Sequence, residues 1–163
     1  MTRRSLVRPA LRRLAVLLLA AACAVPAAAQ LRDSATVVTA TVAPETLRAA
    51  VGDPVRLTVT MTIADGWHLY AHGDSTYYGI NIAGLDSLPL AAVRVDYPAG
   101  HPGTFLGAPV QLLRGTEQAV VTGYLTALPA GPLHLELECQ ACDEKSCLAP
   151  AWLPLDVTVL PKE

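Results

Sequence analysis

The sequence predicts an all-β, immunoglobulin-like antiparallel sandwich of two sheets, and three observations support this fold class. Apolar and polar residues alternate in several short stretches, the pattern of a strand with one buried face. Residues that favour turns separate these stretches, and no segment after residue 29 keeps a helical period. Apolar residues make up 52 % of the chain and charged residues 16 %, which excludes intrinsic disorder.

The expected strands follow in order along the chain. The alternation is clearest at 55–63, 133–139 and 153–159, and weaker at 36–42, 67–71, 92–97, 110–114 and 118–127. Seven or eight short strands separated by Pro and Gly turns are typical of a two-sheet sandwich. Because proline has no N–H for a neighbouring strand, Pro154 predicts that the last strand lies at an edge or bulges there.

Residues 1–29 predict a cleaved secretory signal peptide. Five arginines and no acidic residue occupy the first 13 positions, an apolar run follows at 14–25, and three alanines end at Ala29. The apolar run is too short to cross a bilayer comfortably. Lipid attachment at Cys23 and twin-arginine export remain alternatives to ordinary cleavage and export. We therefore expect residues 30–163 to form a single periplasmic or secreted domain.

The charge of this predicted domain excludes two classes of partner. From Gln30 onward the chain has 7 basic and 14 acidic residues, a formal charge of 7 − 14 = −7. Such a domain lacks the positive charge needed to bind nucleic acid or an anionic membrane. It is also long enough to fold without disulfides. The three cysteines it contains therefore need another explanation; these are Cys139, Cys142 and Cys147.

The cysteines lie between the predicted strands 133–139 and 153–159, where a hairpin-like connection brings Cys142 and Cys147 within disulfide distance. A structural disulfide closing so short a loop contributes only about 2 kcal/mol. A zinc site is a second reading, but no further C-x2-C or H-x3-H spacing follows. Its histidine ligands would come from His68, His72, His101 or His134. A redox-active dithiol is the third reading, and the residues alone leave it equal to the structural disulfide.

A family resemblance favours the redox reading. Residues 140–150, QACDEKSCLAP, resemble the Q-A-C-D-x-x-x-C-x-x-P signature of the DsbD N-terminal domain family of thiol:disulfide interchange proteins. Residues 66–70, GWHLY, resemble the G-W-H-x-Y segment of the same family. The likeness covers about residues 37–160 and implies an immunoglobulin-like fold.

The resemblance also implies an activity and partners. A domain of this family carries reducing equivalents from a thioredoxin-like donor to periplasmic disulfide isomerases or to the thioredoxins of cytochrome c maturation. Cys147 is then expected to form the mixed disulfide with a partner, and Cys142 to resolve it. No metal or organic cofactor is implied, and the membrane reductase is expected on a separate chain. The alternative is a non-catalytic binding module braced by a structural Cys142–Cys147 disulfide.

Family members shield the disulfide with a cap loop, and its counterpart here is residues 75–79, preceded by Asp74. Tyr77 would replace the capping phenylalanine, an aromatic lid over sulfur. The two carboxylates that precede the lid in the well-studied type are absent, and Asp74 is a shifted substitute. Ordinary loop packing of Tyr77 and Tyr78 remains the alternative.

Charged residues beside the cysteines predict slow thiols. Asp143 and Glu144 follow Cys142 and oppose formation of a thiolate, whereas Lys145 offsets them only in part. We expect exchange to become fast only when a docked partner supplies a thiol of low pKa. The remaining residues of interest are expected to be packing residues: Cys139 as a buried, inert thiol, and His68, Trp67, Tyr70 and Trp152 in the core or at strand edges.

Overall fold

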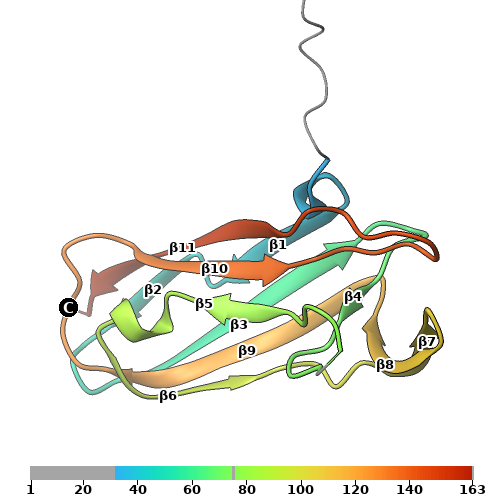
Figure 1. The fold of residues 1–163 in the computed structure, drawn as a ribbon. Coiled ribbons are helices and arrows are strands. Elements are labelled where there is room, and N and C mark those ends of the chain that lie inside the picture. The colour runs from blue at the N-terminus through green and yellow to red at the C-terminus, as the bar shows by residue number, and fades with distance from the viewer. Residues whose placement is uncertain (1–31, 75, 163) are drawn as a thin grey trace, which may run out of the picture. The chain divides into compact units, whose positions relative to one another are not determined.

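The computed structural model describes residues 32–74 and 76–162 (Figure 1). The predicted signal peptide, its cleavage site and Cys23 lie outside these residues, so they stay predictions. In the part that is described, no helix has the length and apolar character needed to cross a membrane.

Strands make up the architecture, as expected, and they form three sheets. The first sheet has the order β1-β3-β9-β6, with β1 (Val38–Ala43), β3 (Pro54–Ile63), β9 (Thr116–Leu125) and β6 (Leu90–Asp96). The second has the order β2-β11-β10-β5, with β2 (Thr46–Ala49), β11 (Ala151–Pro161), β10 (Leu133–Cys139) and β5 (Asn81–Ala83). The third has the order β4-β8-β7, with β4 (Leu69–Tyr70), β8 (Ala108–Leu113) and β7 (His101–Phe105). Two 3-10 turns, Ser34–Thr36 and Leu85–Ser87, complete the described elements.

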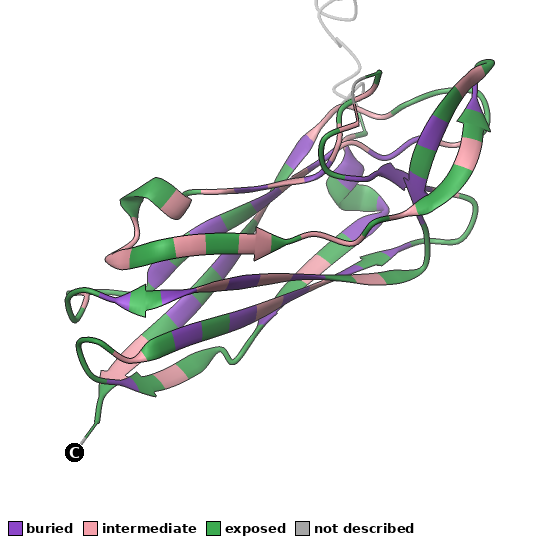
Figure 2. Ribbon diagram, turned by 90° about the horizontal axis from the view of Figure 1, so that it is seen from below, coloured by how far each residue is buried: buried purple, intermediate pink, exposed green. Residues whose placement is uncertain are grey.

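The core lies between the two four-stranded sheets and follows the predicted alternation (Figure 2). Along β3, Leu57, Val59 and Met61 are fully buried while the residues between them are half-buried. Every second residue of β10 is buried in the same way, ending with Cys139. Burial raises the pKa of the Cys139 thiol to about 12, and the charge of Asp33 adds to the effect. Cys139 is therefore the buried, unreactive thiol that the alternation predicts.

The structure corrects the predicted strand map in several places. Residue 36 belongs to a 3-10 turn rather than to a strand, and the strand expected at 67–71 covers only Leu69–Tyr70. Three short strands, β2, β5 and β7, were not predicted, and neither was the third sheet. The pairing of β2 with β11 is parallel, whereas an antiparallel sandwich was expected.

The prediction for Pro154 holds at its own position, although β11 as a whole lies between β2 and β10. This residue pairs with Glu136 of β10, but β2 contacts β11 only from Thr158 to Pro161. At Pro154 the strand therefore has a hydrogen-bonded neighbour on one side only, and the missing N–H of proline leaves no gap in the sheet.

One end of the sandwich gathers the segments that carry the cysteines. The connection between β10 and β11, residues 140–150, lies at the end opposite the C-terminus, and the third sheet lies at the same end (Figure 1). Ala141 and Leu148 of this connection pack into the sandwich core.

Candidate redox site

Cys142 and Cys147 form a disulfide across a tight hairpin within residues 140–150. The two residues face each other in an antiparallel bridge, and their Cα atoms are 4.0 Å apart. The flanking backbone bonds are Leu148 N–H to Ala141 O at 2.9 Å and Asp143 N–H to Ser146 O at 2.9 Å. The cysteines thus occupy a non-hydrogen-bonded position, where side chains of opposite residues come closest. The predicted pairing is confirmed, and backbone geometry alone places the two sulfurs within bonding distance.

Asp143 closes the turn between the two cysteines. Its Oδ1 accepts hydrogen bonds from the backbone N–H groups of Lys145 and Ser146, at 2.8 and 2.7 Å. These two bonds are the main reason that the pKa of Asp143 lies below its ordinary value. The carboxylate therefore stays charged at neutral pH and shapes the turn, while Glu144 and Lys145 beside it are exposed. The predicted effect of these three charges on thiol reactivity stays a prediction.

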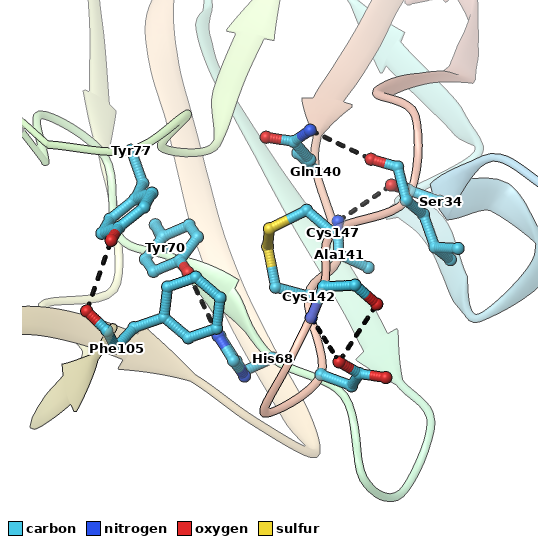
Figure 3. Close-up of a disulfide and its surroundings, with 12 residues drawn as sticks. Ser34, His68, Tyr70, Tyr77, Phe105, Gln140, Ala141, Cys142 and Cys147 are labelled. Carbon is cyan, nitrogen blue, oxygen red and sulfur yellow. Dashed lines mark hydrogen bonds between the residues drawn. A yellow bond between two sulfur atoms is a disulfide. The ribbon is translucent and has the colours of Figure 1, made fainter. Parts of the chain in front are cut away.

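Ser34 joins the two stems of the hairpin to the rest of the domain. Its hydroxyl donates to Ala149 O at 2.8 Å and accepts from Ala141 N–H at 2.8 Å (Figure 3). Gln140 adds a bond between the stems, from its side-chain amide to Leu148 O at 3.0 Å. Ser34 is fully buried and was not singled out in the sequence, because its partners lie more than 100 residues away. No local pattern reveals such a contact.

His68 connects the hairpin to the third sheet. The backbone N–H of His68 donates to the backbone oxygen of Cys142 at 2.9 Å, and the backbone N–H of Cys142 donates to the backbone oxygen of His68 at 3.0 Å. This bridge extends the direction of β4, whose Leu69 and Tyr70 pair with β8. His68 itself is buried, with 3 % of its surface exposed. The G-W-H-x-Y segment and the cysteine signature begin 74 residues apart in sequence and are hydrogen-bonded neighbours.

An aromatic cluster encloses Cys142. Its buried members are Tyr70, Phe105, Val110, Leu112 and Cys142 itself, and Tyr77 packs against them. Figure 3 shows the rings of Tyr70, Phe105 and Tyr77 on one side of Cys142. The rings of Tyr70 and Phe105 meet edge to face at 5.9 Å, and each also contacts the His68 ring, at 5.3 and 5.4 Å. Burial raises the pKa of Tyr70 to about 12, so its hydroxyl keeps its proton. Phe105 was not predicted to belong to the site.

The two sulfur-bearing residues differ sharply in exposure. Cys142 has no exposed surface, because the aromatic cluster packs around it and its backbone is bonded to His68. Cys147, on the other arm of the same hairpin, is exposed. The exposed arm of the hairpin therefore carries Cys147, and the buried arm carries Cys142.

The predicted cap loop contacts the aromatic cluster through Tyr77. The Tyr77 ring stacks on Tyr70 at 4.6 Å, and its hydroxyl donates to Phe105 O at 3.3 Å. Asp74 holds the turn, since its Oδ1 accepts from the N–H groups of Thr76 and Tyr77 at 2.9 and 3.0 Å. Tyr78 is not a member of the cluster, and 41 % of its surface is exposed.

We expect Tyr77→Ala to speed reduction of the disulfide by dithiothreitol at pH 7 by about tenfold. When a thiol attacks Cys147, Cys142 must leave as a thiolate, and an apolar enclosure disfavours that charge. Removing the Tyr77 ring uncovers Tyr70 and lets water approach Cys142. Alkylation of the released thiols after timed quenching gives the rate.

Tyr78→Ala is the matched control, because it removes a neighbouring ring that does not pack on the cluster. We expect its reduction rate to stay within about twofold of the unmodified protein. Equal rates for Tyr77→Ala and Tyr78→Ala would show that Tyr77 is an ordinary loop residue.

The four histidines do not gather around the cysteines. His72 stacks on Tyr97 at 3.8 Å, and His134 pairs with Asp156 at 2.7 Å on the exposed face of β10. Only His68 is hydrogen-bonded to the hairpin. Within residues 32–74 and 76–162 no three His, Cys, Asp or Glu side chains are arranged to hold a metal ion. The two cysteines are joined as a disulfide, and His72 and His134, two of the histidines named as zinc ligands, have other partners.

The two tryptophans that were expected to be packing residues lie in different surroundings. Trp67 packs against the sandwich core. Trp152 is 52 % exposed and donates a hydrogen bond to Glu138 at 3.0 Å across the paired strands β10 and β11. Trp67 agrees with the packing role expected for it, whereas the exposure of Trp152 leaves its expected packing role untested.

Comparison with known proteins identifies the family of the chain. The N-terminal domain of ScsB from Proteus mirabilis, described as periplasmic, matches with a TM-score of 0.50 and 17 % identity, over 74 % of this chain and 44 % of that one. This chain thus spans less than half of that structure. The reduced N-terminal domain of Neisseria meningitidis DsbD matches with a TM-score of 0.47 and 20 % identity, over 79 % of this chain and 90 % of that one. No curated protein matches the sequence. The family model "Thiol:disulfide interchange protein DsbD, N-terminal" matches residues 34–152, and the chain belongs to this family.

Proposed function

We propose that this domain is a thiol–disulfide exchange module in which Cys147 meets the partner and Cys142 resolves the mixed disulfide. The exposure of the two residues carries the proposal: Cys147 is exposed, and Cys142 is fully buried in the same hairpin. Membership of the family supports the reaction class. Ala141 and Leu148, next to the two cysteines, pack into the sandwich core, so the disulfide can open without removing the scaffold.

The exchange moves one electron pair between sulfurs. A partner thiolate attacks Sγ of Cys147, a partner–Cys147 disulfide forms, and the Cys147–Cys142 bond breaks with its electrons on Sγ of Cys142. A second partner thiol then attacks the mixed disulfide and leaves this domain reduced and the partner oxidised. In the opposite direction Cys147 attacks a partner disulfide and Cys142 displaces the partner thiol. Because only sulfur atoms change oxidation state, the reaction needs no metal or organic cofactor.

The partners we propose are thioredoxin-like proteins outside the cytoplasm. One would donate electrons to this domain, and others, disulfide isomerases or cytochrome-maturation thioredoxins, would accept them. The −7 charge after residue 29 suits recognition of a protein surface rather than of nucleic acid. Asp143 and Glu144 beside the hairpin would keep the free thiols slow until such a partner docks.

The reduction potential of the Cys142–Cys147 disulfide tests the proposal. Equilibration of the purified protein with glutathione buffers is expected to give a potential above about −300 mV, the range of labile and catalytic disulfides. A potential below about −300 mV would assign the disulfide to bracing, as in the alternative of a non-catalytic binding module. Quenching by acid and alkylation separates the oxidised and reduced species by mass. Cys139→Ala serves as a control for any contribution from the buried third thiol.

A further inference from the structure

The buried position of Cys142 raises a question of proton transfer, which the exchange reaction alone does not answer. A thiol must lose its proton before its sulfur attacks a disulfide. The apolar surroundings of Cys142 disfavour the thiolate and exclude solvent bases. A nearby group of the protein must therefore accept the proton if Cys142 is to resolve a mixed disulfide quickly.

His68 lies in the position that such a group needs. His68 and Cys142 exchange both backbone hydrogen bonds, so they are directly opposite residues of an antiparallel pair. Side chains of directly opposite residues project to the same face of the sheet, about 4.5–5.5 Å apart at Cβ. The imidazole is held there by edge contacts with Tyr70 and Phe105 and by a 3.4 Å contact between Nε2 and the Tyr70 hydroxyl (Figure 3).

The other ionisable groups around Cys142 are unsuitable as the base. Tyr70 keeps its proton, since its pKa is raised to about 12. The carboxylate of Asp143 accepts the turn hydrogen bonds from Lys145 and Ser146, and its pKa is lowered. The carboxylate of Asp74 likewise accepts hydrogen bonds from the N–H groups of Thr76 and Tyr77.

The charge state of His68 also suits a base. Burial is the largest cause that lowers the pKa of His68 below 6.5, the Arg114 cation lowers it further, and only Asp143 opposes the shift. The imidazole is therefore uncharged at neutral pH and free to accept a proton. Tyr70 on β4 and Phe105 on β7, which pack against the ring, carry no charge at this pH.

We infer that His68 is the general base that takes the proton of Cys142 when the mixed disulfide on Cys147 is resolved. This inference rests on the proposed function. The imidazole accepts the thiol proton, and the freed electron pair on Sγ of Cys142 attacks Sγ of Cys147. A Cys142–Cys147 bond forms, and the Cys147–partner bond breaks with its electrons on the partner sulfur, which leaves as a thiolate. In the reverse reaction the imidazolium returns the proton to Cys142.

The test follows the reaction of the reduced protein with one equivalent of 5,5′-dithiobis(2-nitrobenzoate). Attack by Cys147 releases one thionitrobenzoate, and attack by Cys142 on the resulting mixed disulfide releases the second in a first-order phase. His68→Gln is expected to slow the second phase at pH 7 by at least about tenfold, the lower range of general base effects, and to leave the first phase unchanged. His72→Gln, which alters an exposed histidine outside the cluster, is expected to change neither phase.

The pH profile of the unmodified protein gives a second readout that needs no variant. The second phase is expected to rise with pH through an inflection below pH 6.5 that coincides with the pKa of His68 measured by NMR of its ring. Tyr70→Phe, which removes the hydroxyl near Nε2, is expected to shift this inflection. A second phase insensitive to His68→Gln, or an inflection away from the His68 pKa, would overturn the inference while leaving the proposed function standing. Release of only one thionitrobenzoate per protein would instead contradict the proposed function itself.

Discussion

Ser34→Ala is expected to lower the free energy of unfolding of the oxidised protein by about 2 kcal/mol, roughly a 30-fold change in the folding equilibrium. The hydroxyl of Ser34 is the hydrogen-bond acceptor for the N–H of Ala141, and both residues are fully buried. Alanine cannot accept this bond, so a buried donor is left without a partner, which costs far more than an average hydrogen bond contributes. The bond from the hydroxyl to Ala149 O is lost as well.

Denaturant unfolding of Ser34→Ala and of Ser87→Ala measures this difference. Ser87 is a matched control because its hydroxyl also bonds a backbone carbonyl, Gly84 O at 2.9 Å, but at an exposed turn. Its replacement is expected to cost less than about 0.5 kcal/mol. Hydrogen exchange at the Ala141 amide should also rise in Ser34→Ala alone. Equal stability of the two variants would mean that Ser34 does not anchor the hairpin.

The predictable part of the fold is the part whose side chains alternate. β10 was predicted with its observed bounds, and the β3 prediction differs from the structure by one residue, because each has one face in the core and one toward solvent. β7 was missed because Pro102 and Gly103 argue against a strand. Pro102 is tolerated because β7 is the last strand of its sheet. A Cβ at Gly103 would lie 2.5 Å from a terminal methyl of Leu112, so a larger residue there would require the Leu112 side chain to shift.

The same physics explains how much of the site was predictable. Cys142 and Cys147 were found because a short spacing between two clearly alternating strands predicts a hairpin, and the hairpin fixes the distance between them. Their unequal exposure was not predictable, because it comes from residues of other segments. Phe105 reaches Cys142 through the missed strand β7, and His68 through a bridge to a two-residue strand. Such contacts join residues far apart in sequence and leave no local periodicity.

Cys142→Ser is expected to accumulate a mixed disulfide with an oxidised thioredoxin-like protein, whereas Cys147→Ser is expected to form essentially none. In Cys142→Ser the exposed Cys147 retains its thiol, attacks the partner disulfide and then lacks the sulfur that would displace the partner. In Cys147→Ser the remaining Cys142 is fully enclosed by the aromatic cluster, so a partner disulfide cannot approach it. Non-reducing electrophoresis after alkylation detects the covalent adduct, and dithiothreitol should release it.

The contrast between the two variants is informative because they differ little in chemistry. Both remove the disulfide and replace one sulfur with oxygen, so both lose the same contribution of about 2 kcal/mol from loop closure. A difference in trapping therefore reports the position of the remaining thiol and not the stability of the domain. Adducts from Cys147→Ser alone would reverse the two roles. Adducts from neither variant, with both proteins folded, would remove the exchange proposal and leave a braced hairpin on a β-sandwich.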